Sequence, residues 1–347
     1  MYVGEGTYGC VLRPARSCNK KNTIPKTITK IFDRKEAFDE EIKMHVIVKK
    51  IDPNSVFTVS IHENCPIDLD MYDFDQLKQC EGTINKQEKL GSKNLFQITY
   101  DYGGIDLRDA CKSYPLHVLL KNMRTIFFGL CALEEHRFAH CDIKLANVVF
   151  DPVTQKIALI DFGMATPFDN FYNKERNQEI EFFAQTYIYW PPELKMFNFL
   201  CKKLFSEGDD INNTVIQSNT VHFLAFKNYV QFLESIIMPL YPYVFRLKNV
   251  TKRLKRMAFV NFNSFYRNVK FQNRKTFCNK IDVYALGVLL FEMILRVFRK
   301  GKFKITKYNI DFLEKTINLA FEMTRFDAKK RISPKQAYDI FRKISFP

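Results

Sequence analysis

Apolar residues recur along the chain in two patterns, short runs typical of strands and longer stretches with helical spacing. The run TITKIF (residues 27–32) is rich in β-branched residues and predicts a strand, as does the shorter apolar run over 96–100. Residues 221–237 have helical spacing and predict a helix that packs on another element. Residues 32–51 are expected to form an amphipathic helix. Its apolar positions are Phe38, Ile42, Met44, Val46 and Ile47.

The composition is that of a chain able to form a hydrophobic core. Its 347 residues are 46% apolar, which is enough for one or two ordinary cores. No signal peptide opens the sequence, and no segment offers about twenty uncharged apolar residues for a membrane span. The nearest candidate, residues 221–245, is interrupted by Lys227, Glu234 and two prolines.

The nine cysteines are scattered, with no C-x-x-C pair and no His/Cys cluster at zinc spacing. We therefore expect reduced thiols in a cytosol-like compartment, with no disulfide framework and no metal site of this kind. The acidic run over residues 68–75 lacks the Gly and the terminal Glu of an EF-hand loop, so it is expected to be a solvated loop.

The stretch HCDIKLANVVF (residues 140–150), followed by IDFG (160–163), carries the groups that phosphoryl transfer requires. Asp142 can accept the proton of an attacking hydroxyl, and Lys144 can neutralise the γ-phosphate. Asn147 and Asp161 can hold Mg²⁺. These residue types suit the reaction because its catalysis is mostly positioning and charge stabilisation.

A glycine-rich segment near the start, GEGTYGCV (residues 4–11), matches the pattern of a phosphate-binding loop. Gly4, Gly6 and Gly9 allow backbone N–H groups to approach phosphates, and Val11 completes the pattern. Spaced glycines also serve in ordinary turns, so the segment is informative only through the order of the motifs that follow it.

In this order the segments resemble the eukaryotic-type protein kinases, over residues 1–194 and 280–347. The resemblance implies an α+β, two-lobed kinase fold. Residues 1–102 would form a small β-rich N-lobe with one helix. Only residues 1–3 are left for its first strand, so either an upstream piece is missing or the edge of the small sheet is thin. Residues 103–347 would form a larger helical C-lobe, with a helical insert over 195–280. ATP and Mg²⁺ are the implied cofactors.

The resemblance also implies roles for individual residues. Lys30 is expected to orient ATP through an ion pair with Glu41, and Glu40 is the alternative partner. The residues expected around the adenine and ribose are the backbone groups of Asp101 and Gly103, the side chain of Asp106, and Tyr100 as gatekeeper. The residues expected to support the substrate platform are Thr186, Pro192, Glu193 with Arg331 as its partner, and Asp282 as a brace for the catalytic loop.

Finer features bear on substrate and source. DIK at residues 142–144, together with Thr186, resembles the Ser/Thr branch, so protein Ser and Thr hydroxyls are the expected acceptors. GTYGCVLRPARSC, TKIF and DYGGIDL resemble the divergent kinases of large DNA viruses, which implies a cytoplasmic location, in the host cytoplasm or the virion. The alternative function is a pseudokinase or scaffold, which the intact catalytic set disfavours.

Three positions depart from the family pattern. Cys141 occupies the position before the catalytic Asp, where the family usually has an Arg. That Arg usually forms a charge pair with a phosphate group on the activation segment, so control through this pair is not expected here. Ile28 replaces a small Ala and is expected to crowd the purine slightly. Leu145 replaces a more usual Pro, a change expected to be benign.

The largest departure is the interval of 88 residues between Glu193 and Asp282. Residues 195–280 contain 15 Lys and Arg against 4 Asp and Glu, so they hold +11 of the formal net charge of +15. Residues 246–280 contribute 11 basic residues and no acidic ones. This basic rim is expected either to dock an acidic protein or nucleic acid, or to serve solubility alone.

Overall fold

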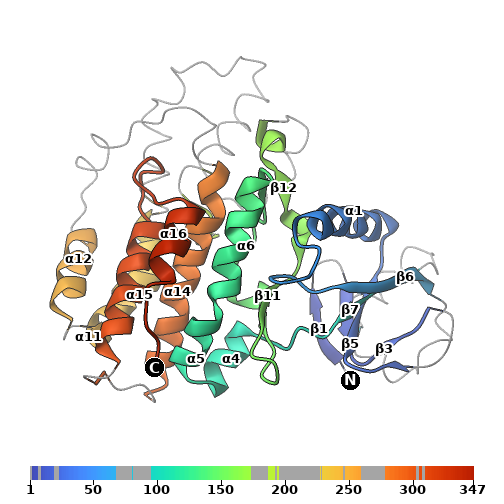
Figure 1. Cartoon of the computed structure of the whole chain (residues 1–347), viewed down its shortest axis with the longest axis horizontal. Helices are drawn as coiled ribbons and strands as arrows, with labels where there is room; N and C mark the ends of the chain where they lie inside the picture. The colour runs from blue at the N-terminus through green and yellow to red at the C-terminus, as the bar shows by residue number, and fades with distance from the viewer. Residues whose placement is uncertain are drawn as a thin grey trace. The chain divides into compact units, whose positions relative to one another are not determined.

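The chain folds into two compact units in a computed structural model (Figure 1). The first unit comprises Met1–Gly104 and Ala158–Gly163, and the second comprises Ile105–Ile157 and Met164–Pro347. A β-rich N-terminal region and a helical C-terminal region confirm the predicted α+β kinase fold. The structure describes residues 2–6, 9–18, 23–67, 80, 95–172, 187–191, 194, 227, 229–244, 247–258, 278–301, 305–306 and 309–347.

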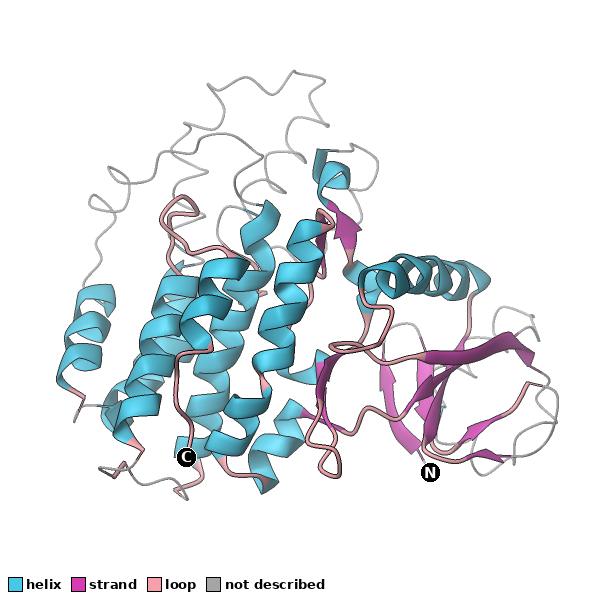
Figure 2. Ribbon diagram, viewed as in Figure 1, coloured by secondary structure: helices cyan, strands magenta, loops and turns pink. Residues whose placement is uncertain are grey.

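The first unit is built on a five-stranded antiparallel sheet (Figure 2) with the strand order β1-β2-β5-β7-β6. Its strands are β1 (Tyr2–Gly6), β2 (Gly9–Leu12), β5 (Thr27–Phe32), β7 (Leu95–Asp101) and β6 (Ile61–Ile67). A separate two-stranded ribbon pairs β3 (Ala15–Arg16) with β4 (Thr23–Ile24). The predicted strands over 27–32 and 96–100 are confirmed as β5 and part of β7. Lys30 stands opposite Val11 on β2 and Ile98 on β7, in the middle of the sheet.

The helix predicted over residues 32–51 is α1 (Lys35–Ile51). Phe38, Met44 and Val48 are buried, whereas Val46 is 51% exposed, so its predicted place on the apolar face is wrong. At 3.6 residues per turn, Val46 and Val48 are about 200° apart around the helix axis. The burial of Val48 therefore turns Val46 towards the solvent.

The prediction that all cysteines are reduced is wrong for four of them. Cys10 forms a disulfide with Cys80, and Cys18 forms one with Cys65, all within the first unit. Sequence spacing could not show these pairs, because the partners are 70 and 47 positions apart and meet only when the strands pack. The ground for expecting a reducing compartment is thereby removed. The free cysteines among the described residues are Cys111, Cys131, Cys141 and Cys278, all buried.

The second unit is organised around α14 (Ile281–Arg299), whose 19 residues include 16 that are buried. A helix that is apolar on all sides is typical of a core position. Its neighbours include α4 (Leu107–Ser113), α5 (Leu116–Asn122) and α15 (Ile310–Met323). A further pair, α6 (Arg124–Glu135) and α16 (Pro334–Phe341), packs together, and α16 also contacts α15. At Gly287 the close packing of α15 excludes any side chain, because a Cβ there would lie 2.8 Å from Met323 Cβ.

The second unit also contains short strands, which flank its loops. They are β8 (Ile105–Asp106), β9 (Phe138–Ala139), β10 (Val148–Phe150) and β12 (Thr166–Pro167). β8 pairs with β10, and β9 pairs with β12. The strand β11 (Ile157–Leu159) forms a hairpin with β10 and leads into the IDFG segment.

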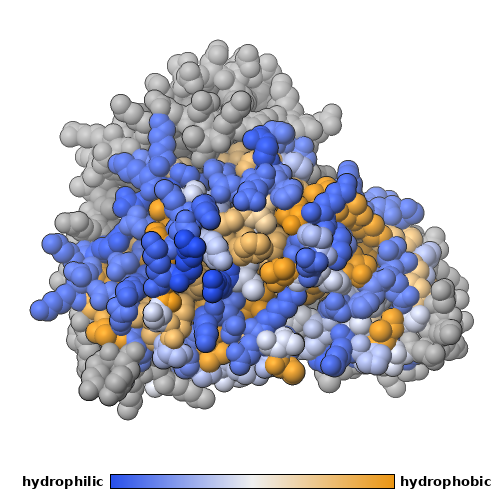
Figure 3. All heavy atoms as spheres, viewed as in Figure 1, coloured by the Kyte–Doolittle hydropathy of each residue, from blue (hydrophilic) through white to orange (hydrophobic). Residues whose placement is uncertain are grey.

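One stretch among the described residues, Leu116–Glu135, is long and apolar enough to cross a membrane by length and composition. Most of it is buried in the second unit, and it is divided between α5 and α6. On the face that Figure 3 shows, hydrophilic side chains lie over α16, in keeping with the exposure of Lys335 and Gln336.

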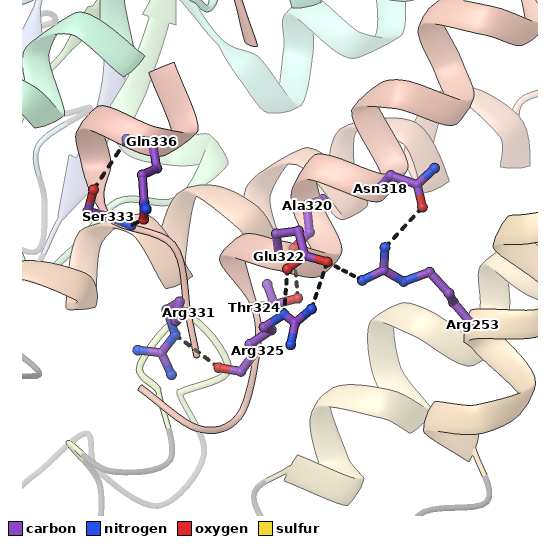
Figure 4. A network of polar contacts seen from close by, with 9 residues as sticks. All are labelled: Arg253, Asn318, Ala320, Glu322, Thr324, Arg325, Arg331, Ser333 and Gln336. Carbon is purple, nitrogen blue, oxygen red and sulfur yellow. Dashed lines mark hydrogen bonds and ion pairs between the residues drawn. The ribbon is translucent and has the colours of Figure 1, made fainter. Parts of the chain in front are cut away.

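The described part of the insert packs on the helical core, as the helical pattern over 221–237 predicts. Its elements are the π-helical turn η7 (Leu233–Ile237), η8 (Met238–Leu240), α11 (Tyr241–Val244) and α12 (Lys248–Ala258). The ring of Phe232 lies 5.9 Å from that of Tyr284 on α14. On α12, Arg253 Nη2 lies 2.5 Å from Glu322 Oε1 on α15, and its Nη1 lies 3.2 Å from Asn318 Oδ1 (Figure 4). Arg253, one of the basic residues of the insert, therefore forms its ion pair inside the protein, with a carboxylate of the helical core.

We expect reduction of the disulfides to destabilise the first unit. Cys18→Ser should lower its free energy of unfolding by about 2–4 kcal/mol, because the bond to Cys65 restricts the unfolded chain. The measurement is urea unfolding with and without dithiothreitol. Cys111→Ser is the control, since it should keep the full dithiothreitol response of the wild type. A wild-type midpoint that dithiothreitol leaves unchanged would contradict the assignment of the disulfides.

Candidate active site

The predicted site residues form two groups, one in each unit. In the first unit, Lys30 on β5 forms an ion pair with Glu41 on α1, with 2.5 Å between Nζ and Oε2. Both side chains are largely buried, at 16% and 14% exposure. Glu40, the alternative partner, is exposed. The pairing is thus the one that the sequence favours, because one helical position separates a core-facing carboxylate from a solvated one.

Glu41 has a second partner, which the sequence does not indicate. The hydroxyl of Tyr100, at the end of β7, donates to Glu41 Oε1 at 2.5 Å. Both oxygens of Glu41 are therefore engaged, one by an ammonium group and one by a phenol. Burial, followed by the Glu41 carboxylate, raises the pKa of Tyr100 well above its ordinary value, so the phenol stays protonated and remains a donor. Tyr100 was expected beside the adenine, and the chain carries no local signal for this contact with a residue 59 positions away.

Asp161 approaches the same lysine. Its Oδ1 lies 3.8 Å from Lys30 Nζ, and its side chain is 43% exposed. Burial lowers the pKa of Lys30, but the Glu41 and Asp161 carboxylates outweigh it and the net shift is upward. The Lys30 side chain therefore stays protonated and positively charged. The backbone of Asp161 is left-handed, with φ of 62°, a conformation that non-glycine residues adopt rarely and mostly where the surroundings impose it.

In the second unit, Asp142 is the centre of the other group, with a side chain only 7% exposed. Its Oδ2 accepts hydrogen bonds from Lys144 Nζ at 2.8 Å and from Asn147 Nδ2 at 2.6 Å. The 3₁₀ turn η3 (Leu145–Asn147) brings Asn147 back towards Asp142, and Nδ2 also donates to the Asp142 carbonyl at 3.0 Å. Asp142 Oδ1 accepts a hydrogen bond from the hydroxyl of Tyr187, a contact that was not predicted.

Asp282, at the start of α14, braces the catalytic loop as predicted. Its two carboxylate oxygens accept the backbone N–H groups of His140 at 2.7 Å and Cys141 at 2.9 Å. Burial raises the pKa of Asp282, while His140 and the two N–H groups act in the opposite direction. These contacts link the loop that carries Asp142 to the core helix of the unit.

The glycine-rich segment is described only in part. Gly4 and Gly6 lie on β1 and Gly9 begins β2, with Val11 two residues further along. A Cβ on Gly9 would lie 2.1 Å from the carbonyl oxygen of Ile31, so this glycine is needed for the approach of β2 to β5. Strand packing thus requires a glycine at position 9, in addition to the phosphate contact that the sequence predicts there.

The side chains predicted near the adenine and ribose have partners within their own units. Asp101 Oδ1 lies 2.7 Å from His62 Nε2. Asp106 is the N-cap of α4, accepting the N–H of Asp109 at 3.0 Å, and its other oxygen accepts from Arg108 Nη2 at 2.6 Å. Gly103 lies in the segment between β7 and β8.

Comparison with known proteins decides the family. A model of the protein kinase domain matches residues 1–199. The chain belongs to the protein kinase family. It is 28% identical to Cyclin-dependent kinase 9 of Xenopus tropicalis over 200 residues, which cover 55% of this kinase and 48% of that protein. It is 24% identical to Cyclin-dependent kinase C-3 of Oryza sativa subsp. japonica over 193 residues, covering 55% and 54%. This kinase spans about half the length of the curated relatives it matches.

Cys141 shows how this kinase organises the position where an Arg is usual. Cys141 is buried, has φ of 63°, and its carbonyl accepts a hydrogen bond from Trp190 Nε1 at 2.7 Å. Both residues belong to an apolar cluster with Ala139, Leu194 and Ile281. Packing therefore connects Trp190 and Leu194 to the loop that carries Asp142. Trp190 is the single Trp of the chain and lies just before Pro192 and Glu193, so its position in the sequence could have indicated this packing contact.

Other predicted features of the substrate platform lie partly outside the described residues. Thr186, Pro192 and Glu193 lie outside them, so the pairing of Glu193 with Arg331 stays a prediction. Arg331 is 1% exposed, and its guanidinium donates to main-chain carbonyls, including that of Arg325 at 3.0 Å (Figure 4).

Asp282→Ala should destabilise this kinase by about 2–5 kcal/mol, because it leaves two buried N–H groups without acceptors. The measurement is the free energy of unfolding from urea titration. Asp311→Ala is the matched control. Asp311 occupies the first turn of α15, but its side chain is 65% exposed and pairs with Lys315, one turn further along the same helix. The control should change stability by less than about 0.5 kcal/mol. Equal losses in the two variants would count against the brace.

Proposed function

We propose that this kinase transfers the γ-phosphate of ATP to Ser and Thr hydroxyls of proteins, with Asp142 as the base. The observation that carries the proposal is the set of contacts around Asp142. Lys144 and Asn147 hold one carboxylate oxygen, and the other accepts a hydrogen bond from a hydroxyl group. An acceptor hydroxyl needs the same arrangement when it gives its proton to a base.

The Lys30–Glu41 pair supports ATP as the donor. The ammonium of Lys30 is held within the sheet by two carboxylates, Glu41 at 2.5 Å and Asp161 at 3.8 Å. A protonated lysine in this position suits the negative charge of nucleotide phosphates. Membership of the protein kinase family agrees with ATP use.

Asn147 and Asp161 are the residues that would hold Mg²⁺. Carboxylate and amide oxygens are the ligand types that this ion prefers. Asn147 Nδ2 is committed to Asp142, which leaves the amide oxygen as the atom able to ligate a metal. When bound, the ion would neutralise charge on the β- and γ-phosphates.

The proposed reaction follows from these assignments. Asp142 takes the proton of the acceptor hydroxyl, and the hydroxyl oxygen forms a bond to the γ-phosphorus. The bond between that phosphorus and the β–γ bridging oxygen breaks, and ADP leaves. Lys144, whose Nζ lies 2.8 Å from Asp142 Oδ2, balances the negative charge at this point. The Ser/Thr preference rests on DIK at residues 142–144 and on Thr186.

The direct test is transfer of ³²P from ATP to casein and to myelin basic protein, an acidic and a basic acceptor. Asp142→Asn should reduce turnover by about 10²–10⁴-fold, because the base is lost while the side-chain volume is kept. Asp169→Asn is the control. Its carboxylate is 79% exposed and pairs with Arg137, so turnover should stay at the wild-type level. Undiminished incorporation by Asp142→Asn would exclude Asp142 as the base.

A second test uses the two neighbouring glutamates of α1. Glu41→Gln should raise the KM for ATP by about 10-fold or more, because Lys30 loses a hydrogen bond to a charged acceptor. Glu40→Gln removes the same charge from an exposed position and should leave that KM unchanged. Initial rates at varied ATP concentration give both values. A similar KM in the two variants would contradict the role given to Glu41.

A further inference from the structure

The two carboxylate oxygens of Asp142 are divided between different kinds of donor. Oδ2 accepts from Lys144 and Asn147, which belong to the same loop. Oδ1 accepts from the phenol of Tyr187, 45 positions away in the chain. Because the Asp142 side chain is only 7% exposed, little of its surface is left for another donor.

This division matters for the reaction proposed above. Each carboxylate oxygen has two lone-pair sites, so the two donors on Oδ2 use both of its sites. Oδ1 is then the oxygen available to an acceptor hydroxyl. Tyr187 uses one of its two sites, and the 7% exposure of the side chain leaves little room for a second hydroxyl beside it. The tyrosine thus makes the contact that a protein substrate has to make.

Packing holds the ring of Tyr187 independently of its hydroxyl. The ring lies 5.6 Å from that of Trp190 in an edge-to-face contact and 5.4 Å from that of Tyr189. Lys144 Nζ lies 5.8 Å from the ring centroid. Trp190 is itself bound to the Cys141 carbonyl at 2.7 Å. A phenylalanine at position 187 would keep these ring contacts and lose only the hydroxyl.

We infer that Tyr187 determines the apparent affinity of this kinase for its protein acceptor, by occupying Asp142 Oδ1 until a substrate hydroxyl replaces it. The inference rests on the proposed function. Only molecules in which the Tyr187 hydroxyl has left Asp142 can accept a substrate hydroxyl. The apparent affinity for the acceptor is therefore reduced by the fraction of molecules in that state. ATP binding and the chemical step are not affected by this equilibrium.

The test is steady-state kinetics of Tyr187→Phe with casein or myelin basic protein, whichever the wild type phosphorylates. The KM for the protein acceptor should fall by about 10-fold, the effect expected from losing one hydrogen bond to a charged group. The kcat and the KM for ATP should stay within about 2-fold of the wild type. A residue that only supports the fold would not lower the acceptor KM selectively. Tyr187→Leu should give the same fall in KM if Tyr187→Phe does not fold.

Tyr189→Phe is the matched control. It removes a phenol hydroxyl two residues away, one that donates to Glu292 and makes no contact with Asp142. Its acceptor KM should not fall. Equal falls in both variants would mean that a loosened segment, and not the Tyr187 hydroxyl, is responsible, which would overturn the inference. A lower kcat without a lower KM in Tyr187→Phe, or no change at all, would also overturn it.

Asp142→Asn distinguishes failure of this inference from failure of the proposed function. If Asp142→Asn is inactive and Tyr187→Phe leaves the acceptor KM unchanged, only the inference falls. If Asp142→Asn keeps wild-type transfer, the assignment of the base falls and the inference falls with it.

Discussion

The loop that carries Asp142 depends on one buried carboxylate, that of Asp282. It lies at the start of α14, a helix with 16 buried residues out of 19, and accepts the N–H groups of His140 and Cys141. Cys141 has a left-handed backbone, which is unfavourable for a residue with a side chain and persists only where neighbouring contacts impose it. Asp282 supplies such contacts. The position of Asp142, the next residue, follows from them.

Around this brace, packing replaces a charge pair found in other protein kinases. Cys141 replaces the Arg that is usual before the catalytic Asp. Its carbonyl accepts a hydrogen bond from Trp190 within an apolar cluster. Apolar contacts do not require a phosphate group to form, so Trp190 reaches the catalytic loop without one. The same arrangement carries Tyr187 to Asp142. Regulation in this kinase is then expected to act on access to Asp142 more than on an Arg–phosphate pair.

Much of the fold and of the candidate site could be predicted because its signals are local. The β-branched run over residues 27–32 predicted the strand that carries Lys30, and the resemblance to protein kinases favoured Glu41 over Glu40 as its partner. Residues 280–295 carry a nearly continuous apolar run, which is a local signal for the core helix α14. Val46 was misplaced because an apolar residue can lie on the solvent side of a helix whose other positions already fill the core contact.

Residue types at fixed short spacing are enough to specify the reaction chemistry, because Asp142, Lys144 and Asn147 meet through one loop and one 3₁₀ turn. The partners of these groups across the fold are not encoded in spacing. Tyr100 meets Glu41, Tyr187 meets Asp142, and four cysteines form two disulfides only because strands and helices distant in sequence pack against each other. Such contacts depend on the whole core, so they emerge only in the folded units.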